Sequence, residues 1–176
     1  VTSLSGTFEH HVTADVAIGM WNYWLVTQDR EWLETRGWPV LKATAEFWVS
    51  RVERTDDGKY HVYNVMGADE WAVNKDDDAY TNGAVKRNLE FATAAAKELG
   101  LNCPSEWMTI ADNIFFGKMA DGVTLEHAGY DGAEIKQADV NLLAFPLKLI
   151  TDKKQCMKDL AYYSTKVHQK KTPAMT

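Results

Sequence analysis

Apolar residues recur at helical spacing along most of the chain. From Phe8 to Gln28, and again from Asp29 to Arg54, they return every three or four residues, which predicts a helical hairpin. Gly37-Trp38-Pro39 interrupts the second pattern and marks where that helix starts or bends. The same spacing predicts four more helices: Thr81 or Asn82 to about Leu99, Ser105 to about Lys118, Ile135 to Ile150 with a kink at Pro146, and Lys153 to about Lys166.

Four segments depart from this helical pattern. Residues 55–58 predict a turn, and residues 59–65 alternate like a short strand. Residues 66–80 and 121–134 are irregular and polar, which predicts long loops. The sequence therefore predicts an all-α fold with one short β excursion near 59–65, in which an α/α toroid of stacked pairs buries a face of every helix.

Composition and charge narrow the classes of function. The chain has 176 residues, 45% of them hydrophobic, and a net charge of -6 without a long Lys/Arg run, so nucleic acid and anionic membranes are disfavoured partners. No apolar stretch reaches the roughly 20 residues of a membrane helix, and we expect a water-soluble chain. Cys103 and Cys156 fix no redox compartment, so a periplasmic, secreted or cytoplasmic location stays open. Seven Trp and seven Tyr suit sugar binding, although most of them are expected in the core.

The strongest candidate for catalysis is the loop that ends at Trp71. Gly67 allows close backbone approach, and Asp69 and Glu70 stand beside the indole. A carboxyl group against an aromatic face in a partly dry cleft keeps its proton and can act as a general acid, a role that suits Glu70. Taken alone, an Asp-Glu pair in a loop is more often a cap or a solvated pair.

Two other polar clusters have structural as well as chemical interpretations. The three aspartates at 76–78 could hold a hard cation, but they lack the glycine and spacing of an EF-hand and are better explained as fixing the loop and capping the next helix. Glu9, His10, His11 and Asp15 could hold a sugar hydroxyl or form polar helix surface. Zinc is discounted there because no third ligand stands at a diagnostic spacing.

Lys136 and Gln137 open a predicted apolar helix and are a third candidate. They could offer donors and an acceptor to hydroxyl groups or phosphate at a cleft edge. The structural alternative is a snorkelling lysine beside a capping glutamine.

Taken together, these segments resemble glycoside hydrolase family 65, which contains maltose, kojibiose and trehalose phosphorylases, acid trehalases and related α-glucoside hydrolases. The likeness lies in the order and spacing of segments spread over nearly the whole chain. They are Glu9-His10-His11-Val12-Thr13-Ala14-Asp15, Thr44-Ala45-Glu46-Phe47-Trp48, Gly67-Ala68-Asp69-Glu70-Trp71-Ala72, Asp76-Asp77-Asp78-Ala79-Tyr80-Thr81-Asn82 and Lys136-Gln137-Ala138-Asp139-Val140.

The resemblance implies part of an (α/α)6 barrel, with residues 1–176 as a fragment and the other barrel helices and a β-sandwich domain outside the chain. It implies inverting cleavage of an α-glucosidic bond with Glu70 as the general acid. The residues it places at the carbohydrate substrate are Glu9, His11, Trp71, Lys136 and Gln137. It implies no metal and no cofactor, apart from inorganic phosphate as co-substrate in a phosphorylase, and it leaves a homo-oligomer open.

One departure from the family pattern favours a hydrolase over a phosphorylase: residues 173–176 stand where the phosphorylases carry a phosphate loop. The family also usually has His where Ala72 stands and Asn at Asp77 and Asp78; these changes leave acid catalysis intact and concern the neighbouring sugar subsite. Glu126 is the nearest candidate for the base, although family hydrolases draw it from downstream of Thr176. A phosphorylase, or a non-catalytic sugar-binding or scaffold module, stays open. A helical-repeat interaction domain would explain the hairpins but not the matched segments.

The sequence leaves linkage, aglycone and oligomeric state undetermined. We expect residues 1–176 alone to be inactive, because an inverting cleft needs both a base and the helices that close the barrel.

Overall fold

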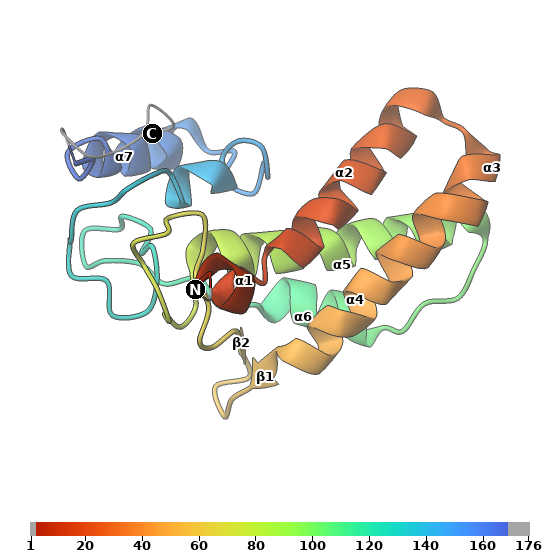
Figure 1. The fold of residues 1–176 in the computed structure, drawn as a ribbon, viewed down its shortest axis with the longest axis horizontal. Helices are drawn as coiled ribbons and strands as arrows, with labels where there is room; N and C mark the ends of the chain where they lie inside the picture. The colour runs from red at the N-terminus through yellow and green to blue at the C-terminus, as the bar shows by residue number, and fades with distance from the viewer. Residues whose placement is uncertain (1–2, 169–176) are drawn as a thin grey trace. The chain divides into compact units, whose positions relative to one another are not determined.

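The computed structural model describes residues 3–168, which divide into two compact units. We call His11–His61 with Ala84–Ile114 the helical unit. The loop unit comprises the described residues of Val1–His10, Val62–Gly83 and Phe115–Thr176. Figure 1 shows long helices in the first and mostly irregular chain in the second. The two units therefore need separate physical explanations.

The helical unit is built on the predicted hairpin, formed by α2 (Val12–Thr27) and α4 (Trp38–Arg51), which pack against each other. α2 is shorter than predicted, because a separate turn, α1 (Ser5–Phe8), precedes it in the loop unit. The buried residues of α2 and α4 are apolar; they are Ala14, Ala17, Trp21, Trp24, Leu41, Ala45 and Trp48. Small residues among tryptophans let the two backbones approach closely.

A wide helical turn marks the predicted bend between the two helices. After α3 (Arg30–Trp32) the chain forms a π-helical turn, η1 (Leu33–Gly37), which α4 follows directly. The Trp38 N–H donates to the carbonyl of Leu33, five residues back. Pro39 has no N–H to donate, so the wider ladder ends where the proline enters α4.

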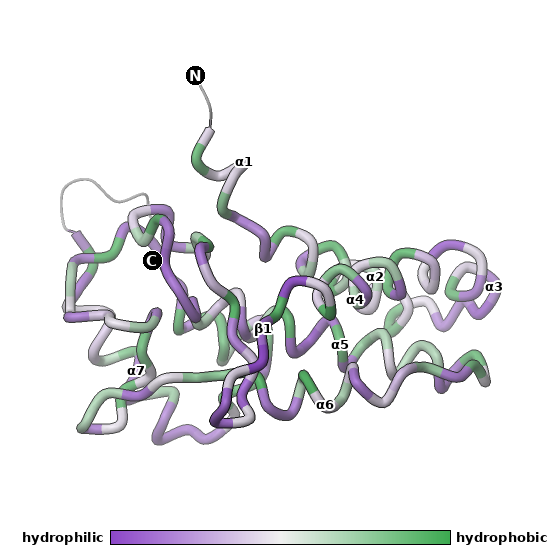
Figure 2. The backbone as a smooth tube through the Cα atoms, turned by 90° about the horizontal axis from the view of Figure 1, so that it is seen from below, coloured by the Kyte–Doolittle hydropathy of each residue, from purple (hydrophilic) through white to green (hydrophobic). Residues whose placement is uncertain are grey.

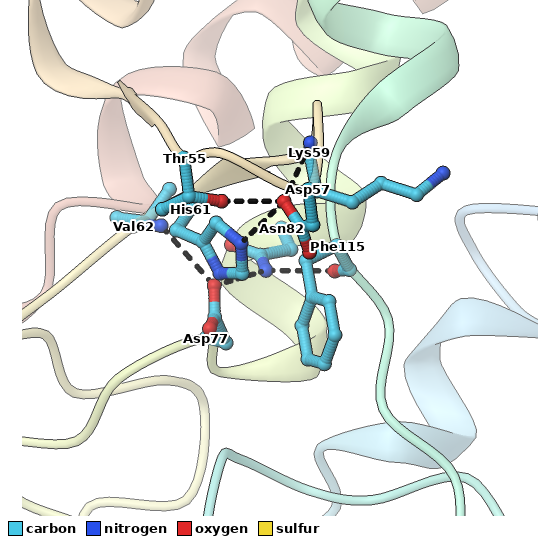
Figure 3. Close-up of polar contacts among 8 residues, drawn as sticks. All are labelled: Thr55, Asp57, Lys59, His61, Val62, Asp77, Asn82 and Phe115. Carbon is cyan, nitrogen blue, oxygen red and sulfur yellow. Dashed lines mark hydrogen bonds and ion pairs between the residues drawn. The ribbon is translucent and has the colours of Figure 1, made fainter.

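The predicted strand is real but shorter than residues 59–65. β2 (Tyr60–His61) pairs antiparallel with β1 (Glu53–Arg54), a segment that the sequence assigned to the end of a helix. The turn between them is tight because Asp57 Oδ1 accepts the Thr55 hydroxyl at 2.5 Å and the Lys59 N–H at 2.8 Å (Figure 3). Side-chain acceptors of this kind close the turn locally.

The central helix α5 (Ala79–Leu99) begins two or three residues before the predicted start at Thr81 or Asn82. Its cap is Asp78, whose Oδ1 accepts the Thr81 N–H at 2.7 Å, so Thr81 lies inside the first turn. The part of α5 in the helical unit is rich in buried alanine, and α6 (Glu106–Asn113) follows, five residues shorter at its end than predicted. Gly100 ends α5 at a φ of 72°, which favours glycine.

The helix predicted for residues 135–150 is wrong. The structure has only a 3-10 turn there, η2 (Val140–Leu143), before α7 (Lys153–Tyr163). The Ile135 N–H donates to the Lys166 carbonyl at 3.0 Å and the Ile135 carbonyl accepts the His168 N–H at 3.3 Å, so this carbonyl does not serve a helical turn. Pro146 has no N–H to continue one. Long-range hydrogen bonds therefore override the helical spacing.

α7 is anchored by a buried polar network in the loop unit. Asp159, only 2% exposed, accepts both the N–H and the hydroxyl of Thr124 at 2.9 Å. The Tyr163 hydroxyl donates to the Thr124 carbonyl at 2.7 Å.

Figure 2 shows hydrophobic and hydrophilic positions alternating along the chain, and within residues 3–168 no helix is long and apolar enough to cross a bilayer.

Candidate active site

The loop unit brings Glu70 and Lys136 together. Glu70 lies in the irregular segment before α5, and Lys136 lies in the loop before η2. The Lys136 ammonium forms an ion pair with Glu70 Oε2, and the two side chains keep 26% and 38% of their surface exposed. The pair is thus accessible to a ligand, while buried side chains hold the backbone of the two segments in place.

Asp69 fixes both segments from the buried side. It is 1% exposed, and its Oδ1 accepts the Trp71 N–H at 3.1 Å and the Lys136 N–H at 3.0 Å. One carboxylate oxygen therefore joins the backbone next to Glu70 to the backbone of its partner.

Asp139 makes a second connection between the same segments. Its Oδ2 accepts the Ala68 N–H at 3.2 Å, and its Oδ1 accepts the Tyr80 N–H at 3.0 Å. Because Tyr80 lies in the first turn of α5, the loop that carries Glu70 is also tied to a helix end.

Four carboxyl groups are buried around these contacts: Asp69, Asp78, Glu126 and Asp139. Burial, aided by the Asp69 and Asp78 carboxylates, raises the pKa of Glu126 to about 9. Burial likewise raises the pKa of Asp139 well above its ordinary value. The shift at Glu126 favours its protonated form.

Gly67 makes the close packing of this cluster possible. A Cβ at that position would overlap the Asp78 carboxylate, so only glycine lets the loop lie against the α5 cap. A cavity of about 130 Å³ opens beside the cluster, and Asp69, Trp71 and Glu126 are among its lining residues.

Trp71 and Gln137 flank the ion pair in sequence. The Trp71 indole is 43% exposed and packs edge-to-face with His168, with ring centroids 5.6 Å apart, so part of its ring is available to a ligand. Gln137 Oε1 is buried without a hydrogen-bond partner among the described residues, which leaves an acceptor for a hydroxyl donor.

His11 and Glu9 fall in different units. His11 belongs to the helical unit, where its Nδ1 lies 2.8 Å from Asp15 Oδ2 at the start of α2. Glu9 ends α1 in the loop unit through its N–H to the Ser5 carbonyl. Among the predicted site residues, the structure thus groups Glu70, Trp71, Lys136 and Gln137. Residues 173–176, predicted to replace a phosphate loop, lie outside the described part.

The aspartates at 76–78 fix the loop, as the sequence indicated. Asp76 accepts the Asn64 N–H at 2.9 Å, and Asp77 accepts the Val62 N–H at 3.3 Å and the Asn82 amide at 3.2 Å (Figure 3). Sequence reasoning missed the bracing roles of Asp69 and Asp139. The only signal was that each lies within a segment quoted for its resemblance.

The chain belongs to glycosyl hydrolase family 65, since residues 2–134 match the profile of its central catalytic domain. Over all 176 residues it is 60% identical to a kojibiose hydrolase of Flavobacterium johnsoniae and 54% identical to one of Mucilaginibacter mallensis, in each case covering 26% of that protein. A solved structure, a putative kojibiose phosphorylase from human microbiome, matches with a TM-score of 0.75 at 16% identity, over 89% of this chain and 30% of the other.

These matches place the all-α chain within the (α/α)6 fold of the family, as the resemblance implied. The chain spans about a quarter of the length of the curated relatives it matches.

Proposed function

We propose that the full-length protein hydrolyses an α-glucosidic bond with inversion and that Glu70 is its general acid. The observation that carries the proposal is the meeting of Glu70 and Lys136, which stand 66 positions apart, at an accessible pair in a chain of glycosyl hydrolase family 65. The remaining barrel helices and the β-sandwich domain would lie outside this chain.

In the proposed step, the Glu70 carboxylic acid gives its proton to the glycosidic oxygen as the bond from that oxygen to the anomeric carbon breaks. Water attacks the same carbon from the opposite face and passes a proton to a carboxylate base, which inverts the configuration. Glu70 ends as a carboxylate and the base as an acid. We assign the base to the part of the protein beyond this chain, because buried Glu126 keeps its own proton.

Because Glu70 is paired with the Lys136 ammonium, substrate binding must weaken this ion pair before Glu70 can act as an acid. A neighbouring ammonium favours an ionised carboxylate over the neutral acid. Sugar hydroxyls that accept from Lys136 Nζ would draw that charge away from Glu70 as the glycosidic oxygen arrives. Binding and protonation would then be coupled at one place.

Other proposed substrate contacts follow from exposed or unsatisfied groups. The open part of the Trp71 ring suits the C–H face of a sugar, and the buried Gln137 Oε1 suits a sugar hydroxyl. His11 and Glu9 remain proposed contacts in the cleft on the strength of the resemblance.

The relatives suggest the substrate class. Both kojibiose hydrolases match the chain from end to end, so we propose kojibiose or a similar α-linked glucoside, cleaved by water and not by phosphate. Glucose release from kojibiose should need no phosphate. Glucose 1-phosphate formed only with phosphate present would instead identify a phosphorylase.

The test of the acid is Glu70→Gln in the full-length protein. We expect turnover of kojibiose to fall by a factor of about 10² to 10⁴, the usual contribution of a positioned acid. α-Glucosyl fluoride, whose leaving group needs little protonation, should lose far less. Near-normal turnover of kojibiose by this variant would remove Glu70 from the mechanism.

A further inference from the structure

We propose that Asp69 is a positioning residue, whose buried carboxylate fixes the separation of Glu70 and Lys136. This inference rests on the proposed function, because it concerns how the acid and its partner are held. Asp69 itself is only 1% exposed.

The geometry concentrates two constraints on one atom. Asp69 Oδ1 accepts at 3.1 Å from the N–H of Trp71, the residue after Glu70, and at 3.0 Å from the N–H of Lys136 itself. A shift of this oxygen would move the backbone of both functional residues at once. Misplacement by about 1 Å can cost on the order of 10²-fold in rate.

A buried carboxylate suits this task better than a neutral group. Charged acceptors make roughly twice as strong a hydrogen bond as neutral ones, and an N–H left unpaired in the interior is costly. Protonated Glu126 adds no second negative charge beside Asp69 at neutral pH. Asp69 Oδ1 can thus hold both N–H groups at hydrogen-bond distance.

Asp139 separates positioning from folding. Through the Ala68 and Tyr80 N–H groups it ties the same loop to the segment after Lys136 and to the first turn of α5. When Asp69 is truncated, this second connection should keep the loop folded while the separation of the pair becomes variable. The expected defect is therefore catalytic before it is structural.

The test compares Asp69→Ala and Asp69→Asn in the full-length protein on kojibiose and on α-glucosyl fluoride. Asp69→Ala should lower kcat on kojibiose by about 10²-fold, and much less on the fluoride, because the acid is misplaced. Asp69→Asn keeps an acceptor oxygen and should recover most of the loss. If Asp69→Ala does not fold, Asp69→Asn alone must shift the ratio of the two rates in the same direction by up to about tenfold.

Asp159→Ala is the matched control, since Asp159 is a second buried aspartate that accepts backbone and hydroxyl groups of a loop. It should lower stability and leave the ratio of the two rates unchanged. A wild-type ratio in the Asp69 variants, or an equal shift in Asp159→Ala, overturns the inference. Glu70→Gln separates the two failures: full activity in that variant removes the proposed function, whereas its loss beside unaffected Asp69 variants removes only the role of Asp69.

Discussion

The helical unit and the loop unit bury different chemistry. The core of the first is apolar: Leu41, Ala45 and Trp48 are completely buried. The loop unit buries carboxyl groups, among them Asp69 and Glu126 at 1% exposure. The difference follows from the backbone, because a helix satisfies its own N–H groups, whereas a buried loop must find acceptors elsewhere.

Aspartate side chains supply those acceptors in the loop unit. Within the described residues they accept from the backbone N–H groups of Val62, Asn64, Ala68, Trp71, Tyr80, Thr81, Thr124 and Lys136. Aspartate oxygens thus take the place of the carbonyl acceptors that a helix would provide. Apolar packing should therefore control the stability of the helical unit, and the protonation of buried carboxyl groups should control the stability of the loop unit.

The largest expected effect is in the apolar core. Trp48→Ala removes a completely buried indole of α4 from the core of the helical unit and should cost about 3–5 kcal/mol. Hydrogen exchange in the full-length protein, measured peptide by peptide, should show the loss in α2 and α4. Trp48→Phe, which keeps most of the apolar volume, should cost clearly less. Equal protection in the alanine variant and the wild type would refute a packing-controlled unit.

The next effect concerns protons in the loop unit. Glu126 has a folded pKa of about 9 against an ordinary value of 4.5. Between these values the unfolded chain releases a proton that the folded unit keeps. Stability from this group is therefore full below pH 4.5 and falls, as pH rises to 9, by up to about 1.4 kcal/mol per pH unit. Asp69 and Asp78 reinforce the shift, and Lys75 opposes it.

Glu126→Gln should remove this dependence, since its amide is neutral at every pH. Opening free energies from hydrogen exchange at pH 6 to 9 should then be flatter in residues 62–83 than in the wild type. Helices α2 and α4 should follow the same trend in both proteins. An unchanged slope in the variant would show that Glu126 is not the titrating group.

Much of the fold was predictable, because helix spacing is a local signal. The hairpin of α2 and α4, the bend at η1 and the start of α7 were predicted from spacing and caps. The same reasoning wrongly predicts a helix over residues 135–150. Its absence depends on a long-range pairing, because the Ile135 carbonyl accepts the His168 N–H from 33 positions away.

The candidate site was predictable only in its exposed members. Glu70 and Lys136 were found as candidates by residue type and by resemblance, and the structure brings them together. The bracing carboxylates were not found. Asp139 reaches Ala68 across 71 positions, and no local pattern distinguishes a bracing aspartate from a solvated one.

The smallest expected effect tests whether the difference between the two units extends to their exposed helix caps. Asp29 caps α3 in the helical unit through the Trp32 N–H at 2.9 Å, and Asp152 caps α7 in the loop unit through the Gln155 N–H, also at 2.9 Å. Each carboxylate satisfies an N–H three residues on, so replacement by alanine should cost about 1 kcal/mol at either site.

Asparagine keeps the acceptor oxygen at both caps and should recover most of this loss, because the bond is made within one turn and owes little to the surrounding unit. Hydrogen exchange in the first turn of α3 and of α7 gives the two costs side by side. The side-chain amide of Gln155 also donates to buried Asp159 at 2.9 Å. This bond offers a route by which the α7 cap could be coupled to the polar interior. A loss for Asp152→Ala several times that for Asp29→Ala would show such coupling, and would mean that even exposed caps in the loop unit depend on its buried charges. Equal losses would confine the difference between the units to their interiors.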